Sequence, residues 1–545
     1  MIQRKSLLIG FLLVLFAFQS CSRKTGHHGE LTGVQDAAMK PAPSDGYADE
    51  GWEMYAPEDN WDEEKPDPFG NESYDEIVEN EFRLVKDQPL STFSVDVDRA
   101  SYANIRRMLN FDQLPPANAV RIEEMINYFN YSYPDPMDDA PIALYSELSD
   151  CPWNPAHKLA RIALKGKSLD LKEAPKSNLV FLLDVSGSMS DYDKLPLLKK
   201  SLKLLVNNMR EEDRVAIVVY ASASGLVLGS TSARKKDKII AALEKLDAGG
   251  STAGGEGLRL AYKVAEENFI KNGNNRVILA TDGDFNVGES SDEAMVKLIE
   301  EKRESGIFIS VLGFGRGNLK DSKMEKIADK GNGNYAYIDN LLEAKKVLVK
   351  EMGGTLFTIA KDVKLQVEFN PTHVTSYRLI GYENRLLKNE DFNDDKKDAG
   401  EMGAGHSVTA LYELIPAGTE TDVTASIDPL KYQETNKTSA ANSYELMQVK
   451  FRYKEPDGDT SKLISQAVLN GHENWNGASQ DFRFAACVAH FGLILRNSQY
   501  MKAGNYESLI KESKSAKGED DEGYRAEFIQ LLEKAALISP DEKAE

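Results

Sequence analysis

Apolar residues recur along most of the chain with the periods of helices and strands. Between residues 177 and 351, short apolar runs alternate with stretches in which apolar residues return every three or four positions. The runs predict buried strands at residues 178–184, 213–220, 276–280 and 307–312. The stretches between and after them predict helices at residues 195–209, 235–246, 258–269, 293–304 and 342–351. This alternation indicates an α/β domain with a doubly wound, mostly parallel sheet, whose ligand site lies beyond the carboxyl ends of the strands.

Strand patterns also flank this segment on both sides. Before it, alternation predicts strands at residues 91–98, 142–148 and 158–164, with amphipathic helices at 99–109 and 120–129. After it, strands are predicted at residues 363–369, 374–379, 408–414, 422–427 and 446–453. We expect the strands at 142–164 to pair with those after residue 363 in one β-sandwich, into which the α/β domain is inserted. A C-terminal helical segment follows, with helices at 482–495, 506–513 and 524–537.

The N-terminus carries an export pattern. Arg4 and Lys5 precede an apolar run at residues 7–18, which is too short to span a bilayer, and Cys21 follows. The pattern resembles a bacterial lipoprotein signal, which implies that Cys21 is lipid-modified and anchors the protein in the cell envelope. No acidic cluster directly follows Cys21, so we expect the outer membrane, facing the periplasm. Phe18 and Gln19 depart from the usual signal, and a conventional cut nearby is the alternative.

Charge and cysteine content limit the partners and the stabilising features that this chain can have. The 545 residues contain 87 acidic and 66 basic side chains, a net charge of −21, which argues against nucleic acid as a partner. Between residues 45 and 81 the sequence has fifteen acidic residues and one basic residue, which predicts a solvated acidic tether. The three cysteines share no metal-ligand spacing. Cys151 and Cys487 form either a disulfide or two buried thiols.

Three loops at the predicted ligand edge of the sheet carry oxygen-bearing side chains. Asp184, Ser186 and Ser188 follow the first strand, and Asp282 follows a later one. Between them, a glycine-rich loop at residues 249–255 contains Thr252 and opens a helix. Hydroxyl and carboxylate oxygens are ligands for small hard cations, and Mg²⁺ among these keeps several waters.

This combination resembles the von Willebrand factor type A domain, a Rossmann-like α/β fold, and its metal-ion-dependent adhesion site. The resemblance implies that Ser186 and Ser188 donate hydroxyl oxygens to a divalent cation, with Thr252 binding directly or through water. Asp184 and Asp282 hold the waters of that cation. Mg²⁺ is the expected ion, with Mn²⁺ or Ca²⁺ as alternatives, and a protein partner supplies an acidic residue to the open position.

Three other interpretations remain open. In the first interpretation, the serines cap the next helix and the aspartates bind backbone amides. In the second, the acidic tether fills the metal site and the protein is a structural or assembly factor. A metal-dependent hydrolase is the third. Against the hydrolase, none of the three loops contains a histidine, and the chain has no G-x-S-x-G motif. We therefore expect a binding protein that is not an enzyme and has no small-molecule substrate.

The flanks resemble those of a bacterial group of type A domain lipoproteins. Residues 89–98, 120–129 and 377–385 carry this resemblance. The expected division of the chain is a signal peptide at 1–20, a disordered acidic tether at 21–86, an N-terminal flanking α+β region at 87–176, the type A domain at 177–354, a β-rich region at 355–478 and C-terminal helices at 479–545.

Overall fold

The computed structural model describes most of the chain from residue 71 to residue 539. The gaps are residues 138–139, 170–173, 252–253, 284, 286–291, 352–356, 398, 421–436, 457, 472–473 and 502–504. The signal segment, Cys21, Thr252 and the strand expected at 422–427 therefore lie outside the described residues. In the part described, no helix has both the length and the apolar character needed to cross a bilayer.

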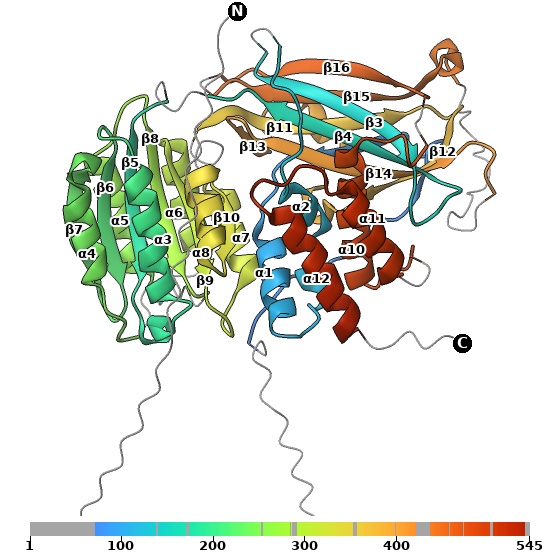
Figure 1. The fold of residues 1–545 in the computed structure, drawn as a ribbon. Helices are drawn as coiled ribbons and strands as arrows, with labels where there is room; N and C mark the ends of the chain where they lie inside the picture. Colours follow the sequence, from blue (N-terminus) through green and yellow to red (C-terminus); the bar gives the residue numbers. More distant parts are fainter. Residues whose placement is uncertain are drawn as a thin grey trace, which may run out of the picture. The chain divides into compact units, whose positions relative to one another are not determined.

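A six-stranded sheet forms the centre of the α/β domain (Figure 1). Its strands, in the order β10-β9-β8-β5-β6-β7, are β5 (Ser177–Asp184), β6 (Arg214–Tyr220), β7 (Ser224–Ser232), β8 (Asn274–Thr281), β9 (Ile307–Phe314) and β10 (Tyr335–Ile338). Only β7, at one edge, is antiparallel to its neighbour. The helices are α3 (Leu195–Asn208), α4 (Lys236–Glu244), α5 (Gly254–Glu267), α6 (Asp292–Glu304), α7 (Asp321–Lys330) and α8 (Leu341–Lys345). The predicted doubly wound, mostly parallel sheet is confirmed.

Helices bury both faces of this sheet, and β5 shows the consequence most clearly. All eight of its residues are buried. Phe181 and Leu183 pack with α3 and α4, whereas Val180 and Leu182 pack with α5 on the opposite face. A strand whose alternate side chains enter two cores is apolar throughout, which explains the continuous apolar run in the sequence.

Several elements of the α/β domain were not predicted. The pattern missed the edge strand β7, helix α7 and the four-residue strand β10. The predicted closing helix is also shorter as an α-helix, because α8 ends at Lys345 and continues as a π-helical turn, Lys346–Lys350. Short or half-exposed elements carry too few apolar positions to show a period.

Two antiparallel sheets form the expected β-sandwich. The first has the order β1-β12-β14-β4-β3 and the second has the order β13-β11-β15-β16, with β2 also paired to β11. Their bounds are β1 (Arg83–Leu84), β2 (Leu90–Ser94), β3 (Ile142–Asp150), β4 (Lys158–Gly166), β11 (Thr358–Phe369), β12 (Val374–Ile380), β13 (Gly400–Gly403), β14 (Ser407–Pro416), β15 (Glu445–Lys454) and β16 (Lys462–Leu469). Because β4 pairs with β14 across the whole α/β domain, the predicted insertion is confirmed.

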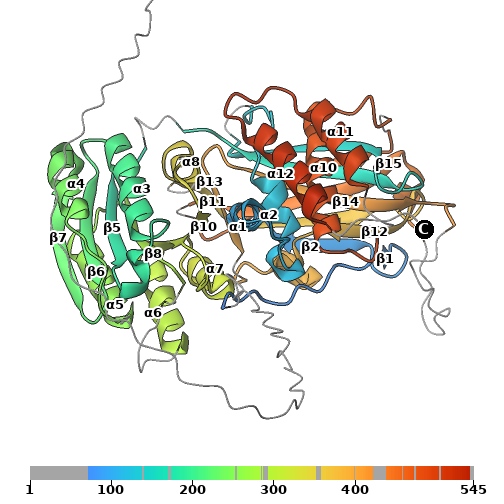
Figure 2. The same cartoon turned by 60° about the horizontal axis from the view of Figure 1, so that its bottom comes forward.

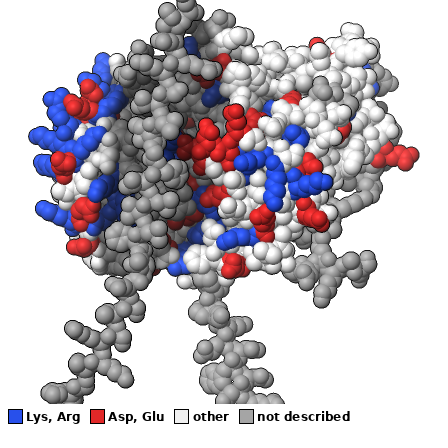
Figure 3. All heavy atoms as spheres, viewed as in Figure 1, with Lys and Arg blue, Asp and Glu red and all other residues white. Residues whose placement is uncertain are grey.

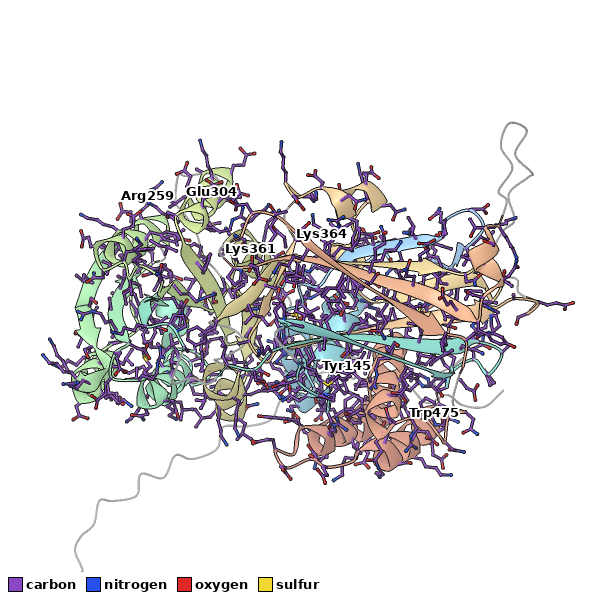
Figure 4. The ribbon with its side chains drawn as sticks, turned by 90° about the horizontal axis from the view of Figure 1, so that it is seen from above. Tyr145, Arg259, Glu304, Lys361, Lys364 and Trp475 are labelled. Atoms are coloured by element: carbon purple, nitrogen blue, oxygen red, sulfur yellow. The ribbon has the colours of Figure 1, made fainter. Side chains whose placement is uncertain are left out.

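A group of helices from both ends of the chain shares a third core. It contains α1 (Ala100–Asn110), α2 (Ile122–Asn127), α10 (Gln480–Leu495), α11 (Tyr506–Ala516) and α12 (Tyr524–Ile538), which lie together in Figures 1 and 2. Trp475, labelled in Figure 4, contacts this group, and its indole Nε1 donates to Glu512 Oε2 at 2.9 Å. Cys151 and Cys487 both lie buried in this core and are not bridged, so the two-thiol alternative holds.

The expected tether is wrong from residue 71 onward, because this acidic stretch belongs to the fold. Glu72 forms a bidentate pair with Arg107, at 2.6 and 2.7 Å, and its side chain is only 1% exposed. Glu79 pairs with Arg378 and accepts from Ser498. Carboxylates that are paired with buried arginines act as structural groups, although composition alone cannot distinguish them from solvated ones.

Candidate metal site

The candidate site lies where the strand order of the sheet reverses. β5 has β8 on one side and β6 on the other, and both β5 and β8 end in the expected aspartate-bearing loops. Asp184 is the last residue of β5, and Asp282 directly follows β8. Ligands of open α/β sheets bind at such a switch point, where two neighbouring loops diverge.

Asp184 connects the ends of these two strands. Its Oδ1 accepts a hydrogen bond from the Ser186 backbone N–H at 2.9 Å, and its Oδ2 accepts one from the Thr281 hydroxyl at 3.2 Å. The Thr281 hydroxyl in turn accepts from the Gly283 N–H at 3.2 Å. The carboxylate is fully buried and its orientation is fixed by these bonds. It therefore holds the loop after β5 and the end of β8 in fixed positions.

Two serine hydroxyls lie next to one another above this carboxylate. Ser186 Oγ and Ser188 Oγ are 3.1 Å apart, with Ser186 buried and Ser188 exposed. The glycine-rich loop meets the same turn, because the Gly187 N–H donates to the Gly250 carbonyl at 2.9 Å. The structure thus brings Asp184, Ser186 and Ser188 together with the loop that carries Thr252, while Thr252 itself lies outside the described residues.

Asp282 is buried with one satisfied and one unsatisfied carboxylate oxygen. Its Oδ2 accepts from Lys194 Nζ at 2.9 Å, whereas its Oδ1 has no hydrogen-bond partner among the described residues. A buried acceptor without a partner costs free energy, about 1–3 kcal/mol for an ordinary polar group. A water held by a divalent cation would satisfy it, so the side chains present fit the implied metal.

Burial also affects the acidity of Asp184. The pKa of Asp184 is raised, chiefly by burial, and the nearby Asp282 carboxylate raises it further. The hydrogen bonds from Ser186 oppose this shift because they favour the charged form. A cation near both carboxylates would lower the cost of keeping them ionised.

The sequence did not reveal Lys194 or Thr281 as parts of the site. Lys194 is 5% exposed, and its side chain passes Gly315, where a Cβ would approach the Lys194 Cε to 2.4 Å. Gly315 also has a φ of +70°, which favours glycine. A lysine just before a helix looks like a surface residue, and only the close packing of the Gly315 turn directs it inward.

A second kind of metal site is one built from carboxylate, imidazole or thiol groups. Among the residues that the structure describes, no group of three or more His, Cys, Asp or Glu side chains is arranged to hold a metal ion. The candidate site therefore depends on neutral hydroxyls supported by buried carboxylates. Such a donor set leaves a bound divalent cation with much of its positive charge, so that it attracts an additional anionic ligand.

Models of known protein families match three parts of the chain. The model of the von Willebrand factor type A domain matches residues 178–350, a von Willebrand factor model matches residues 68–161, and the C-terminal model of the uncharacterized protein YfbK matches residues 354–538. A solved von Willebrand factor type A protein from Catenulispora acidiphila is 13% identical, with a TM-score of 0.41, and the match covers 72% of this chain and 89% of that one.

Two bacterial relatives show different extents of similarity. The uncharacterized protein sll0103 of Synechocystis is 30% identical over 187 residues, which cover 34% of this chain and 43% of that protein. The uncharacterized protein YfbK of Escherichia coli is 46% identical over 474 residues, which cover 86% of this chain and 81% of that protein. The chain therefore belongs to the YfbK family of von Willebrand factor type A domain proteins.

Proposed function

We propose that the protein is a cell-envelope lipoprotein that binds a protein partner through a divalent cation held at the ends of β5 and β8. The observation that carries this proposal is the layering of the site. Buried carboxylates with one unsatisfied oxygen lie beneath two adjacent hydroxyls, the outer of which is exposed. This layering suits a cation that the buried groups hold on one side and that accepts a ligand on its solvent-exposed side.

Each residue has a separate part in this proposal. Ser186 and Ser188 would hold Mg²⁺ directly, and Thr252 would do so directly or through water, with Mn²⁺ or Ca²⁺ as the alternative ions. Asp184 and Asp282 would hold its waters. The bound cation supplies an open position for a carboxylate of the partner. The chain's own part is to orient the hydroxyls and to keep the two carboxylates buried.

The charge distribution on the α/β domain favours an acidic partner. On the edge of the domain that carries α4, Lys and Arg side chains are prominent, with acidic side chains between them (Figure 3). The lysines on α3 and α4 are Lys199, Lys200, Lys203, Lys236 and Lys238. Since the whole chain has a net charge of −21, this face has the opposite sign to the molecule and would steer an acidic surface toward it.

Metal binding is tested first, without a partner. Mg²⁺ and Mn²⁺ are titrated calorimetrically into the full-length protein and into the Ser186→Ala/Ser188→Ala variant. Ser190→Ala is the matched control, because Ser190 is an exposed serine in the same turn, Gly187–Ser190. We expect binding to wild type and Ser190→Ala and a loss of at least about tenfold in affinity in the double variant. Equal binding by all three proteins would refute the metal site.

Partner binding is tested next, in envelope extract with and without EDTA. A band that wild type and Ser190→Ala retain, and that both EDTA and the double variant remove, supports metal-dependent adhesion. A band that persists in EDTA contradicts it. Turnover of an ester or peptide that Asp184→Ala abolishes would replace the binding function with a hydrolase.

The membrane anchor rests on the N-terminal pattern. Mass spectrometry of the N-terminal peptide of the protein purified from membranes should find a lipid-modified Cys21. Cys21→Ser should shift the protein from the membrane fraction to the soluble fraction. An unmodified N-terminus created by a cut near Cys21 would disprove lipidation and leave the metal site unaffected.

A further inference from the structure

A second candidate site lies where the α/β domain meets the β-sandwich. Here a cavity of about 450 Å³ is bounded by β8, β9, β10 and the π-helical turn on one side, and by the end of β4 and residues 404–407 on the other. Figures 1 and 2 both place β10 and α8 beside β11 and β13. The volume is within the usual range for small-molecule sites, about 300–1,000 Å³.

Arg276 of β8 lines this cavity and is 2% exposed. Its Nη1 donates to Ser310 Oγ at 2.7 Å, and its guanidinium lies 5.5 Å from the Phe308 ring. Its Nε has no hydrogen-bond partner among the described residues, and none of their carboxylates lies within ion-pair distance of it. A buried guanidinium in this state is costly to the fold.

Other buried arginines of the protein are paired, which sets Arg276 apart. Arg106 contacts Asp339, Glu343 and Glu527, and Arg121 contacts Glu124 and Asp321. Arg378 contacts Glu79 and Glu413. The neighbouring acids raise the pKa of Arg106 and Arg121, whereas burial lowers the pKa of Arg276 to about 10, a shift that the Glu401 carboxylate opposes.

The acids in the cavity wall are already occupied. Asp98 accepts from the Tyr335 N–H at 2.8 Å and pairs with Arg385, and Glu351 pairs with Arg99 and Lys346. Lys165 and Lys350 also line the cavity. Burial lowers the pKa of His406 to about 3, so this wall residue is neutral. The lining therefore carries more basic than acidic side chains, although Lys350 pairs with Glu522 and Lys165 lies 3.9 Å from Asp135.

The wall beside Arg276 is apolar. Ile278 and Leu312 of the sheet, with Val347 and Leu348 of the π-helical turn, face the same cavity as Arg276. Water alone would leave this surface unfavourably hydrated, and a simple inorganic anion would not cover it.

We propose that this cavity binds a small organic acid, whose carboxylate pairs with Arg276 and whose apolar body packs against Ile278, Leu312 and Val347. Arginine matches a carboxylate with two parallel N–H···O bonds, one of which would satisfy Nε. The Glu401 carboxylate favours the charged guanidinium from a distance, and the ligand would add a carboxylate in direct contact with it. The site is separate from the candidate metal site and requires no cation.

The test uses the full-length protein in EDTA, so that it is independent of the metal site. Butyrate, hexanoate and octanoate are titrated calorimetrically, with 1-hexanol as the uncharged match and inorganic phosphate as an anion without an apolar body. The test variant is Arg276→Met. Arg214→Met is the control, because Arg214 of β6 also bonds a serine, Ser230, on a neighbouring strand but does not line the cavity.

We expect at least one of the three carboxylates to bind wild type and Arg214→Met, and to bind Arg276→Met about tenfold to a hundredfold more weakly. We also expect Arg276→Met, measured without ligand, to melt at or above the wild-type temperature, because the unpaired charge is removed. Failure of all three carboxylates to bind overturns the proposal. Equal binding by Arg276→Met, by 1-hexanol or by phosphate also overturns it.

Discussion

At the scale of single residues, the candidate metal site has an internal competitor for its cation. Lys194 Nζ lies 2.9 Å from Asp282 Oδ2 and compensates this carboxylate in the structure described here. The same ammonium group would repel a divalent cation nearby. Lys194 would therefore stabilise the protein without metal and weaken the proposed metal binding, two effects that a single substitution separates.

The variant Lys194→Met should bind Mn²⁺ about tenfold more tightly than wild type, a gain of about 1.4 kcal/mol, because one positive charge near the site is removed. Its melting temperature in EDTA should fall, since the buried Asp282 loses its partner. Calorimetry and thermal melts measure the two effects. Weaker Mn²⁺ binding by the variant would show that Lys194 helps to hold the cation site together.

His490 makes stability depend on pH. It lies on α10 against Trp153, and burial lowers its pKa to about 4 from an ordinary 6.5. Below pH 6.5 the unfolded chain binds a proton that the folded protein excludes, so stability is lost as the pH falls from 6.5 toward 4.

Between pH 7 and pH 5, wild type should lose about 2 kcal/mol more unfolding free energy than His490→Leu. Urea unfolding at the two pH values provides the comparison. Parallel losses in both proteins would mean that His490 is protonated equally in the folded and unfolded states.

At the scale of elements, Arg106 joins three helices from distant parts of the chain. It extends from α1 to Glu343 of α8 and Glu527 of α12, and it also contacts Asp339. The Tyr128 hydroxyl donates to the same Glu343 oxygen at 2.7 Å. The last helical segment of the α/β domain is thus attached to the helical core by a buried network of charges.

Replacing Arg106 with methionine should lower the unfolding free energy by about 3–5 kcal/mol, because buried carboxylates lose their counter-charge. Adding Glu343→Gln to this variant should restore part of the loss. Lys350→Met is the control, because its pair with Glu522 is exposed and should contribute less than about 1 kcal/mol. Equal effects of Arg106→Met and Lys350→Met in urea unfolding would contradict a buried network.

At the scale of the whole molecule, strands and helices from both ends of the chain enclose the α/β domain as an insertion. β4 and β14 pair directly, although the α/β domain separates them in sequence. The acidic stretch before β1 contributes to the same assembly through Glu72 and Glu79. Residues that look like a solvated linker therefore carry part of the folding free energy.

Glu72→Gln should lower the melting temperature measurably, because Arg107 is 5% exposed and loses a bidentate carboxylate. The expected loss is about 2–3 kcal/mol. Asp75→Asn, an exposed residue in the same acidic stretch, is the control and should change stability by less than about 0.5 kcal/mol. Equal melting temperatures for the two variants would mean that this acidic stretch is a tether and not part of the fold.

The sequence by itself determined the features that depend on local period and on chain order. Continuous apolar runs such as β5 predict a strand buried on both faces, and the order of strands and helices predicts which loops share an edge of the sheet. This was sufficient to place Asp184, Ser186, Ser188 and Asp282 at one site. Strands on both sides of the α/β domain were sufficient to predict the sandwich and the insertion.

Only the tertiary structure decided which charged side chains have partners. Lys194 and Asp282 are 88 positions apart, Arg106 and Glu527 are 421 apart, and no period relates such residues. Whether a carboxylate reaches a buried arginine depends on loop paths and on close packing at positions such as Gly315. For this reason the sequence could not distinguish Glu72 from a solvated acid. Nor could it reveal that Arg276 is buried without a carboxylate in ion-pair contact among the described residues.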